Sequence, residues 1–320
     1  MDPGGFLADV EQTPDTLGRL ADALDRGDVL CAVPPATSEA VRVLLLGMGS
    51  SAYAASVVAA RLRAGGHDAV AELASSDLLP PAEPGTLVLG VSASGGSVET
   101  VAAVSRYVGR SQVLAVTERA EGAVSAGVLG VVPLLAGAEP GGVSCRSYRH
   151  TLAVLLALAD QLRPGTAPDV AGLCRRAAEA TADLLDRRTT WLPDVSEALD
   201  GPAGSWVVAP ARRLSSAQQS ALMLREGPRR PAHACETGDW SHVDVYLTKT
   251  LDYRMLLLPG SAWDAALLAW TTERDATVVA VGAGVPSATL SVRYAGDDED
   301  DVRLLAETTV AELVAHHWWT

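Results

Sequence analysis

The chain has 320 residues, 48% of them hydrophobic and 20% charged, which suits about two folded domains and argues against disorder. Its 25 basic and 39 acidic residues give a net charge of −14, so we expect no binding to nucleic acid or to an anionic membrane surface. The 4 cysteines form no CxxC pair, and no signal sequence or long apolar run is visible. We therefore expect a reduced, cytoplasmic protein with no membrane span and no zinc cluster.

Strands and helices are predicted to alternate along the chain. A short lead helix over 16–24 is followed by a buried strand at 43–46 and a helix that ends near 65–66. Further strands are predicted at 86–91, 112–117 and 128–135, followed by a strongly periodic helix over 147–162 and a linker helix over 169–188. The pattern then restarts with strands at 205–210, 253–259, 277–281 and 290–294, and with helices ending at Glu226 and spanning 261–275 and 301–316.

This order predicts an α/β fold of two tandem doubly wound parallel-sheet domains, flavodoxin-like in type. We place a lead helix at 1–28, the first domain at 29–164, a linker helix at 165–200 and the second domain at 201–320. The two halves share their order of elements and little sequence, so the repeat is predicted from element order alone.

Two loops rich in glycine and serine follow strands of the first domain. One contains Gly49, Ser50 and Ser51, and the other runs from Ser92 to Ser97. Parallel strands bind ligands at their carboxyl ends, and helix N-termini with small hydroxyl residues suit a phosphate. The competing interpretation is that these are ordinary turn and capping residues. The third glycine of a dinucleotide fingerprint and the Gly-Lys-Ser/Thr of a Walker A loop are both missing.

These loops resemble those of the SIS (sugar isomerase) family, specifically its two-domain members, and the likeness extends over nearly the whole chain. Gly49-Ser50-Ser51 is similar to the family's G-T/S-S turn, and Ser92-Ala93-Ser94-Gly95 is similar to its S-x-S-G phosphate loop, with Ser97 in place of a threonine. The stretch 136–144, ending at Ser144, resembles the family's "AGPEIGVAS", and Arg146 falls near its lysine.

The second domain carries a further resemblance. The stretch 221–226 (ALMLRE) is similar to the family helix "ALKLKE", and 238–242 (GDWSH) is similar to "GELKH". Glu226 and His242 are 16 residues apart, as in the family. The resemblance implies that Glu226 moves a proton between C1 and C2 of a phosphorylated sugar or aminosugar, and that His242 assists ring opening or loss of an amine. It also implies a phosphate site made by Gly49, Ser50, Ser51, Ser92, Ser94, Ser97 and Ser144, with no metal or cofactor.

The resemblance further implies a homodimer, for which Trp318 and Trp319 offer apolar surface, with the catalytic loop of one chain near the phosphate site of the other. The chain lacks a glutaminase domain, and Met223 stands where the family synthases have a lysine. We therefore expect aldose–ketose isomerisation or deglycation, with no amino transfer. The turn 209–211 has lost its glycines, which predicts one phosphate site per chain.

The alternative is a non-catalytic sugar-phosphate sensor. A sensor would keep the serine loops and would not need Glu226 and His242 at this spacing. His316-His317 is interpreted as a frayed end, and Arg146 as either a phosphate partner or a solvent-facing helix start. Lys249 is the single lysine, so only it could form a Schiff base.

Overall fold

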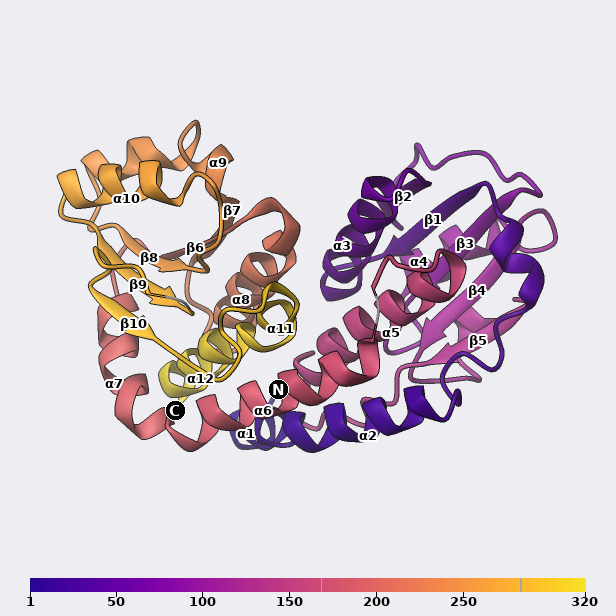
Figure 1. Cartoon of the computed structure of the whole chain (residues 1–320), viewed down its shortest axis with the longest axis horizontal. Helices are drawn as coiled ribbons and strands as arrows, with labels where there is room; N and C mark the ends of the chain where they lie inside the picture. The colour runs from indigo at the N-terminus through magenta and orange to yellow at the C-terminus, as the bar shows by residue number, and fades with distance from the viewer. Residues whose placement is uncertain (168, 283) are drawn as a thin grey trace. The chain divides into compact units, whose positions relative to one another are not determined.

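The computed structural model describes residues 1–167, 169–282 and 284–320, which form two compact units (Figure 1). The first-sheet unit comprises Thr16–Ala138 and Arg146–Cys174. The second-sheet unit comprises Met1–Asp15, Glu139–Cys145 and Arg175–Thr320. The second-sheet unit is thus assembled from three stretches that are separated in sequence.

The first sheet has, among the described residues, five parallel strands in the order β2-β1-β3-β4-β5. This is the flavodoxin-like order, in which the chain changes direction between β1 and β3. The elements up to the end of this half are α1 Pro3–Glu11, α2 Thr13–Asp25, η1 Pro35–Glu39, β1 Arg42–Gly47, α3 Ser50–Ala64, β2 Asp68–Leu73, β3 Thr86–Val91, α4 Val98–Ser105, β4 Gln112–Thr117, η2 Ala123–Ser125, β5 Gly130–Pro133 and α5 Arg146–Leu162.

The second sheet repeats this order. Its five strands, counted over the residues that the structure describes, lie in the order β10-β9-β8-β6-β7. β6 therefore has the same position in this sheet as β1 has in the first, one strand in from an edge. The remaining elements are α6 Val170–Asp186, α7 Arg188–Leu199, β6 Ser205–Ala209, η3 Ala211–Arg213, α8 Leu214–Glu226, β7 Ala232–Glu236, α9 Thr237–Trp240, η4 Asp244–Lys249, β8 Arg254–Leu257, α10 Asp264–Glu273, β9 Thr277–Val281, β10 Leu290–Val292, α11 Asp300–Ala306 and α12 Thr308–Trp319.

Helices cover each sheet, and an apolar core lies between the strands and these helices. In the first-sheet unit, Leu44 and Val88 of the central strands pack with Tyr107, which is buried. In the second-sheet unit, the Trp206 and Tyr253 rings stack 4.2 Å apart, and Trp240 Nε1 donates a hydrogen bond to Tyr253 Oη (2.8 Å). Truncating a buried side chain such as Leu44 to alanine typically costs about 2–5 kcal/mol, so these residues fix the sheets that carry the loops described below.

Several sequence-based boundaries were wrong. Strands β2 and β7 were missed, and helices α1 and α7 were not separated from their neighbours. The strand expected at 128–135 is limited to β5, since Leu135 has a φ of 59°. The single closing helix is two helices, α11 and α12, and α12 continues to Trp319, so His316-His317 is helical and not frayed.

Candidate functional site

The two serine loops lie at the switch point of the first sheet. β1 and β3 are neighbours, and the helices that follow them, α3 and α4, begin at Ser50 and Val98. Because both strands are parallel, their carboxyl ends meet at one edge of the sheet. The sheet order therefore brings together the loops that the sequence predicted as a phosphate site.

The first loop passes directly from strand to helix. A Cβ atom on Gly47 would lie 3.0 Å from the Ser51 Cβ, so a glycine permits this close approach. Gly49 has a φ of 50°, and within the described chain no side chain caps α3. Ser50 and Ser51 occupy the first turn of α3 and are half-buried. The two hydroxyl groups therefore lie at the N-terminus of α3, which is the positive end of the helix dipole.

The serines of the second loop differ in their surroundings. Ser92 is only 4% exposed, whereas Ser94 is exposed and its Oγ accepts a hydrogen bond from Gly96 N (3.3 Å). Ser97 is the N-cap of α4: its Oγ accepts from Thr100 N (3.4 Å) and donates to a Glu99 carboxylate oxygen (3.0 Å). Ser97 therefore serves the helix start, and Glu99 brings a negative charge close to this loop.

The segment before α5 is held by its own polar groups. Arg146 is 3% exposed, and its guanidinium donates to the carbonyl oxygens of Ala136 (3.0 Å) and Ala138. It is therefore not a solvent-facing helix start, and its role as a phosphate partner stays a prediction. In the second-sheet unit, the Ser144 carbonyl oxygen accepts from Gln219 Nε2 (2.7 Å), which ties this backbone to α8.

Glu226 is the last residue of α8 and is half-buried. Burial raises the pKa of its carboxyl above the ordinary value, and the nearby Arg225 opposes this only in part. A carboxylate with a raised pKa takes up a proton more readily near neutral pH. This property suits a general base that exchanges a proton with carbon.

The two tryptophans of α12 pack against the loop that follows Glu226. A Cβ atom on Gly227 would lie 2.9 Å from Trp319 Cε3, and the Trp319 ring is 5.9 Å from that of Phe6. The Arg230 guanidinium lies 4.6 Å from the centre of the Trp318 ring. Both tryptophans thus pack on their own chain and remain partly exposed, and their contribution to a homodimer stays a prediction.

His242 lies beyond the opposite end of β7 from Glu226. α8 ends at Glu226 before β7 begins, and His242 comes after α9, which follows β7. His242 is exposed, and its backbone N–H donates to Asp239 O (2.8 Å). The five residues of β7 span roughly 16 Å at about 3.3 Å each. The chain therefore runs the length of this strand between the two predicted catalytic residues.

A pair of polar side chains near His242 was not predicted. Asp244 is half-buried, and burial raises the pKa of its carboxyl, while a hydrogen bond from the Cys235 thiol lowers it. Burial, together with the negative charge of Asp244, raises the pKa of the Cys235 thiol to about 12. This thiol therefore stays protonated and is a poor nucleophile. Such burial depends on the tertiary fold, and no local sequence signal reveals it.

The described residues contain no group of three or more His, Cys, Asp or Glu side chains that could hold a metal ion. No helix within 1–167, 169–282 or 284–320 is both long and apolar enough to cross a membrane.

Comparisons with known proteins identify the fold. No protein-family model matches the chain, and no curated sequence matches it. The C-terminal domain of glucosamine-fructose-6-phosphate aminotransferase from Francisella tularensis matches with a TM-score of 0.83 and 14% identity, covering 98% of this chain and 95% of that one. Tagatose-6-phosphate ketose/aldose isomerase from Escherichia coli matches with a TM-score of 0.76 and 18% identity, over 98% and 92%.

A third match has the same extent. Glucosamine-6-phosphate deaminase from Thermotoga maritima has a TM-score of 0.75 and 17% identity, with 98% of this chain and 94% of that one covered. The structural neighbours are SIS-domain proteins of the phosphosugar isomerase type. The two-domain α/β SIS fold expected from the sequence is thereby confirmed.

Proposed function

We infer that this protein is an enzyme that isomerises or deglycates a phosphorylated sugar or aminosugar. The observation that carries this proposal is the meeting of two serine loops at the switch point of the first sheet. Hydroxyl groups and helix N-terminal N–H groups there would hold the phosphate. The phosphosugar enzymes among the structural neighbours support the same substrate class.

In the proposed reaction, Glu226 removes a proton from one carbon of the opened sugar and returns it to the next. Its raised pKa supports this role, because the carboxyl group must both accept and release a proton. His242 would open the ring or protonate a departing amine. Lys249 has no part in the proposal, since an enediol or enolamine needs no imine with the protein.

The position of β7 between Glu226 and His242 supports a site shared between two copies of the chain. A hexose phosphate is much shorter than the roughly 16 Å that five strand residues span. One molecule of substrate would then meet Glu226 of one chain and His242 of another. The proposed enzyme is accordingly a homodimer, in which each site needs both chains.

Exchange of the substrate's C1 or C2 hydrogen with deuterated water tests the proposal. For a phosphosugar that the wild type turns over, Glu226→Gln should lower kcat by about 10²–10⁴-fold and abolish exchange, because glutamine cannot take up the proton. Binding of the phosphosugar should persist. Glu236→Gln is the matched control, since Glu236 uses its carboxylate to accept from Gly238 N (2.7 Å).

Two results would contradict the proposal. Exchange at the wild-type rate in Glu226→Gln would show that another group is the base. Tight binding without turnover across a panel of phosphosugars would instead favour a sensor.

A further inference from the structure

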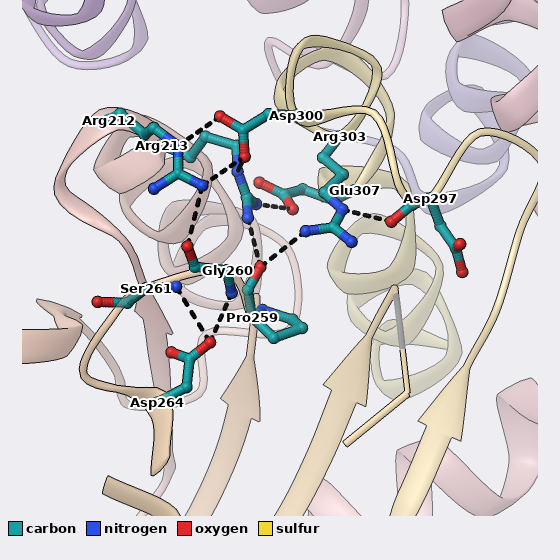
Figure 2. A network of polar contacts seen from close by, with 10 residues as sticks. All are labelled: Arg212, Arg213, Pro259, Gly260, Ser261, Asp264, Asp297, Asp300, Arg303 and Glu307. Atoms are coloured by element: carbon teal, nitrogen blue, oxygen red, sulfur yellow. Dashed lines mark hydrogen bonds and ion pairs between the residues drawn. The ribbon is translucent and has the colours of Figure 1, made fainter. Parts of the chain in front are cut away.

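Arginines gather at the switch point of the second sheet. β6 and β8 are neighbours there, as β1 and β3 are in the first sheet, so the loops after them flank the corresponding crevice. Arg212 and Arg213 follow β6, and Pro259 to Ser261 follow β8 (Figure 2). The place that carries serine loops in the first sheet therefore carries two cationic side chains in the second.

A carboxylate of the chain itself lies between these two arginines. Arg212 donates from Nε to Asp300 Oδ2 (2.6 Å) and from Nη2 to Asp300 Oδ1 (2.9 Å), which is the forked geometry that arginine also uses for phosphate. Arg213 Nε donates to Asp300 Oδ1 (2.9 Å). The Asp300 side chain keeps 35% exposure, so this carboxylate lies where solvent and ligands can reach it.

A second carboxylate occupies the backbone of the loop after β8. The N–H groups of Gly260 and Ser261 both donate to Asp264 Oδ2, at 2.6 and 3.0 Å. Successive N–H groups directed at one oxygen form the kind of nest that binds anions. Asp264 is the first residue of α10, so it also stabilises the start of that helix.

The base of the crevice is closed by buried groups. The Arg213 side chain is 0% exposed and also donates to Glu307, which is fully buried, and to the carbonyl oxygen of Pro259. Arg303 donates to the carbonyl oxygens of Asp297 and Pro259 (Figure 2). Figure 2 thus shows Arg212, Arg213 and Arg303 beside the carboxyl groups of Asp264, Asp300 and Glu307, while the Asp297 carboxylate pairs with Arg293, which the figure does not draw. The cationic groups of the crevice are thus already partnered by groups of the chain itself.

We propose that the second switch point is an anion-binding site whose anion is part of the chain. The Asp300 and Asp264 carboxylates take the places of phosphate oxygens, and they keep a phosphorylated ligand out of the second sheet. This inference rests only on the second-sheet unit and does not depend on the proposed function. It predicts that removing the internal anion creates a phosphate site.

Inorganic phosphate is the probe. In a Ser92→Ala, Ser94→Ala background, which weakens the first-sheet loops, Asp300→Ala should bind phosphate about tenfold or more tightly than its parent, because two guanidinium groups lose their partner. Calorimetry should report the binding, and phosphate should raise the melting temperature of the variant more than that of the parent. Adding Arg212→Ala should abolish the gain.

Asp300→Asn keeps the side-chain volume, so it carries the same test if the alanine variant does not fold. Asp298→Ala is the matched control, because it removes an acid close to Asp300 in sequence, whereas Arg212 and Arg213 donate to Asp300, to Glu307 and to backbone carbonyl oxygens. A folded Asp300 variant with the phosphate affinity of its parent would overturn the proposal. An equal gain in phosphate affinity in Asp298→Ala would also overturn it, because the gain would then follow from the change in net charge alone.

Discussion

Ser92 and Ser94 are two hydroxyl residues with different surroundings in one loop. Ser92 is buried at the end of β3, and Ser94 is exposed. Replacing both with alanine should remove charge-assisted hydrogen bonds worth roughly 1.5–3 kcal/mol each, and so weaken phosphosugar binding by about a hundredfold or more. Ligand-induced shifts of the melting temperature measure this loss.

The matched control is Ser97→Ala, because Ser97 caps α4. We expect this variant to lower stability by about 1 kcal/mol and to affect binding less. If the double variant responds to a phosphosugar as strongly as the wild type, the serine loop is not the phosphate site.

Local residue patterns predicted the serine loops, since Gly47 and the hydroxyl residues stand next to each other in sequence. The surroundings of Arg146 and Trp319 were not predicted, because they depend on contacts between distant segments. Arg146 binds the carbonyl oxygens of a loop, and Trp319 packs on Gly227, 92 positions earlier in the chain. A charged or aromatic side chain gives no local sign of such a partner.

At the scale of elements, the buried strands were predicted well, whereas the two edge strands β2 and β7 were missed. β3 is buried at every residue, so its apolar run marks it as a strand. β2 and β7 lie at sheet edges and are partly exposed, so they lack such a run. Their place follows from backbone pairing with β1 and β6, which composition does not reveal.

Helix α5 contains a buried histidine that should make stability depend on pH. Burial lowers the pKa of His150 to about 4, while the Leu134 carbonyl oxygen, 2.8 Å from Nδ1, opposes this, and Arg146, Arg149 and Arg19 lower it further. A carbonyl oxygen only accepts, so Nδ1 carries the proton of the neutral ring. Between about pH 6.5 and about pH 4, the His150 ring is therefore protonated in the unfolded chain and neutral in the folded chain.

The folded state should accordingly lose stability as the pH falls from about 6.5 to about 4, by about 3 kcal/mol from this group. Urea unfolding of wild type and His150→Gln at several pH values measures the difference, because glutamine can still donate to Leu134 and does not titrate here. Equal pH dependence in the two proteins would contradict the assignment.

At the scale of the whole molecule, the shared site predicts that two inactive variants restore each other. In the proposed homodimer, co-expressed Glu226→Gln and His242→Ala chains should form mixed dimers in which one site receives both substitutions and the other receives neither. With random pairing, about a quarter of wild-type activity should return, since half of the dimers are mixed and half of their sites are intact.

The controls are the two variants purified separately with different tags and measured without mixing. Mixed dimers isolated through both tags should hold about half of the wild-type activity per dimer. Mixed dimers as inactive as their parents would show that each chain supplies both residues to its own site.

The divided second-sheet unit has a consequence for biosynthesis. Phe6 of α1 contacts Trp319 of α12, and the Asp9 carboxylate accepts from Gly141 N (2.9 Å). A ribosome releases α1 well before α12, so the apolar side of α1 has no finished partner until α12 has emerged. The first-sheet unit can form while this happens, whereas the unit that carries Glu226 becomes complete only after α12 has emerged.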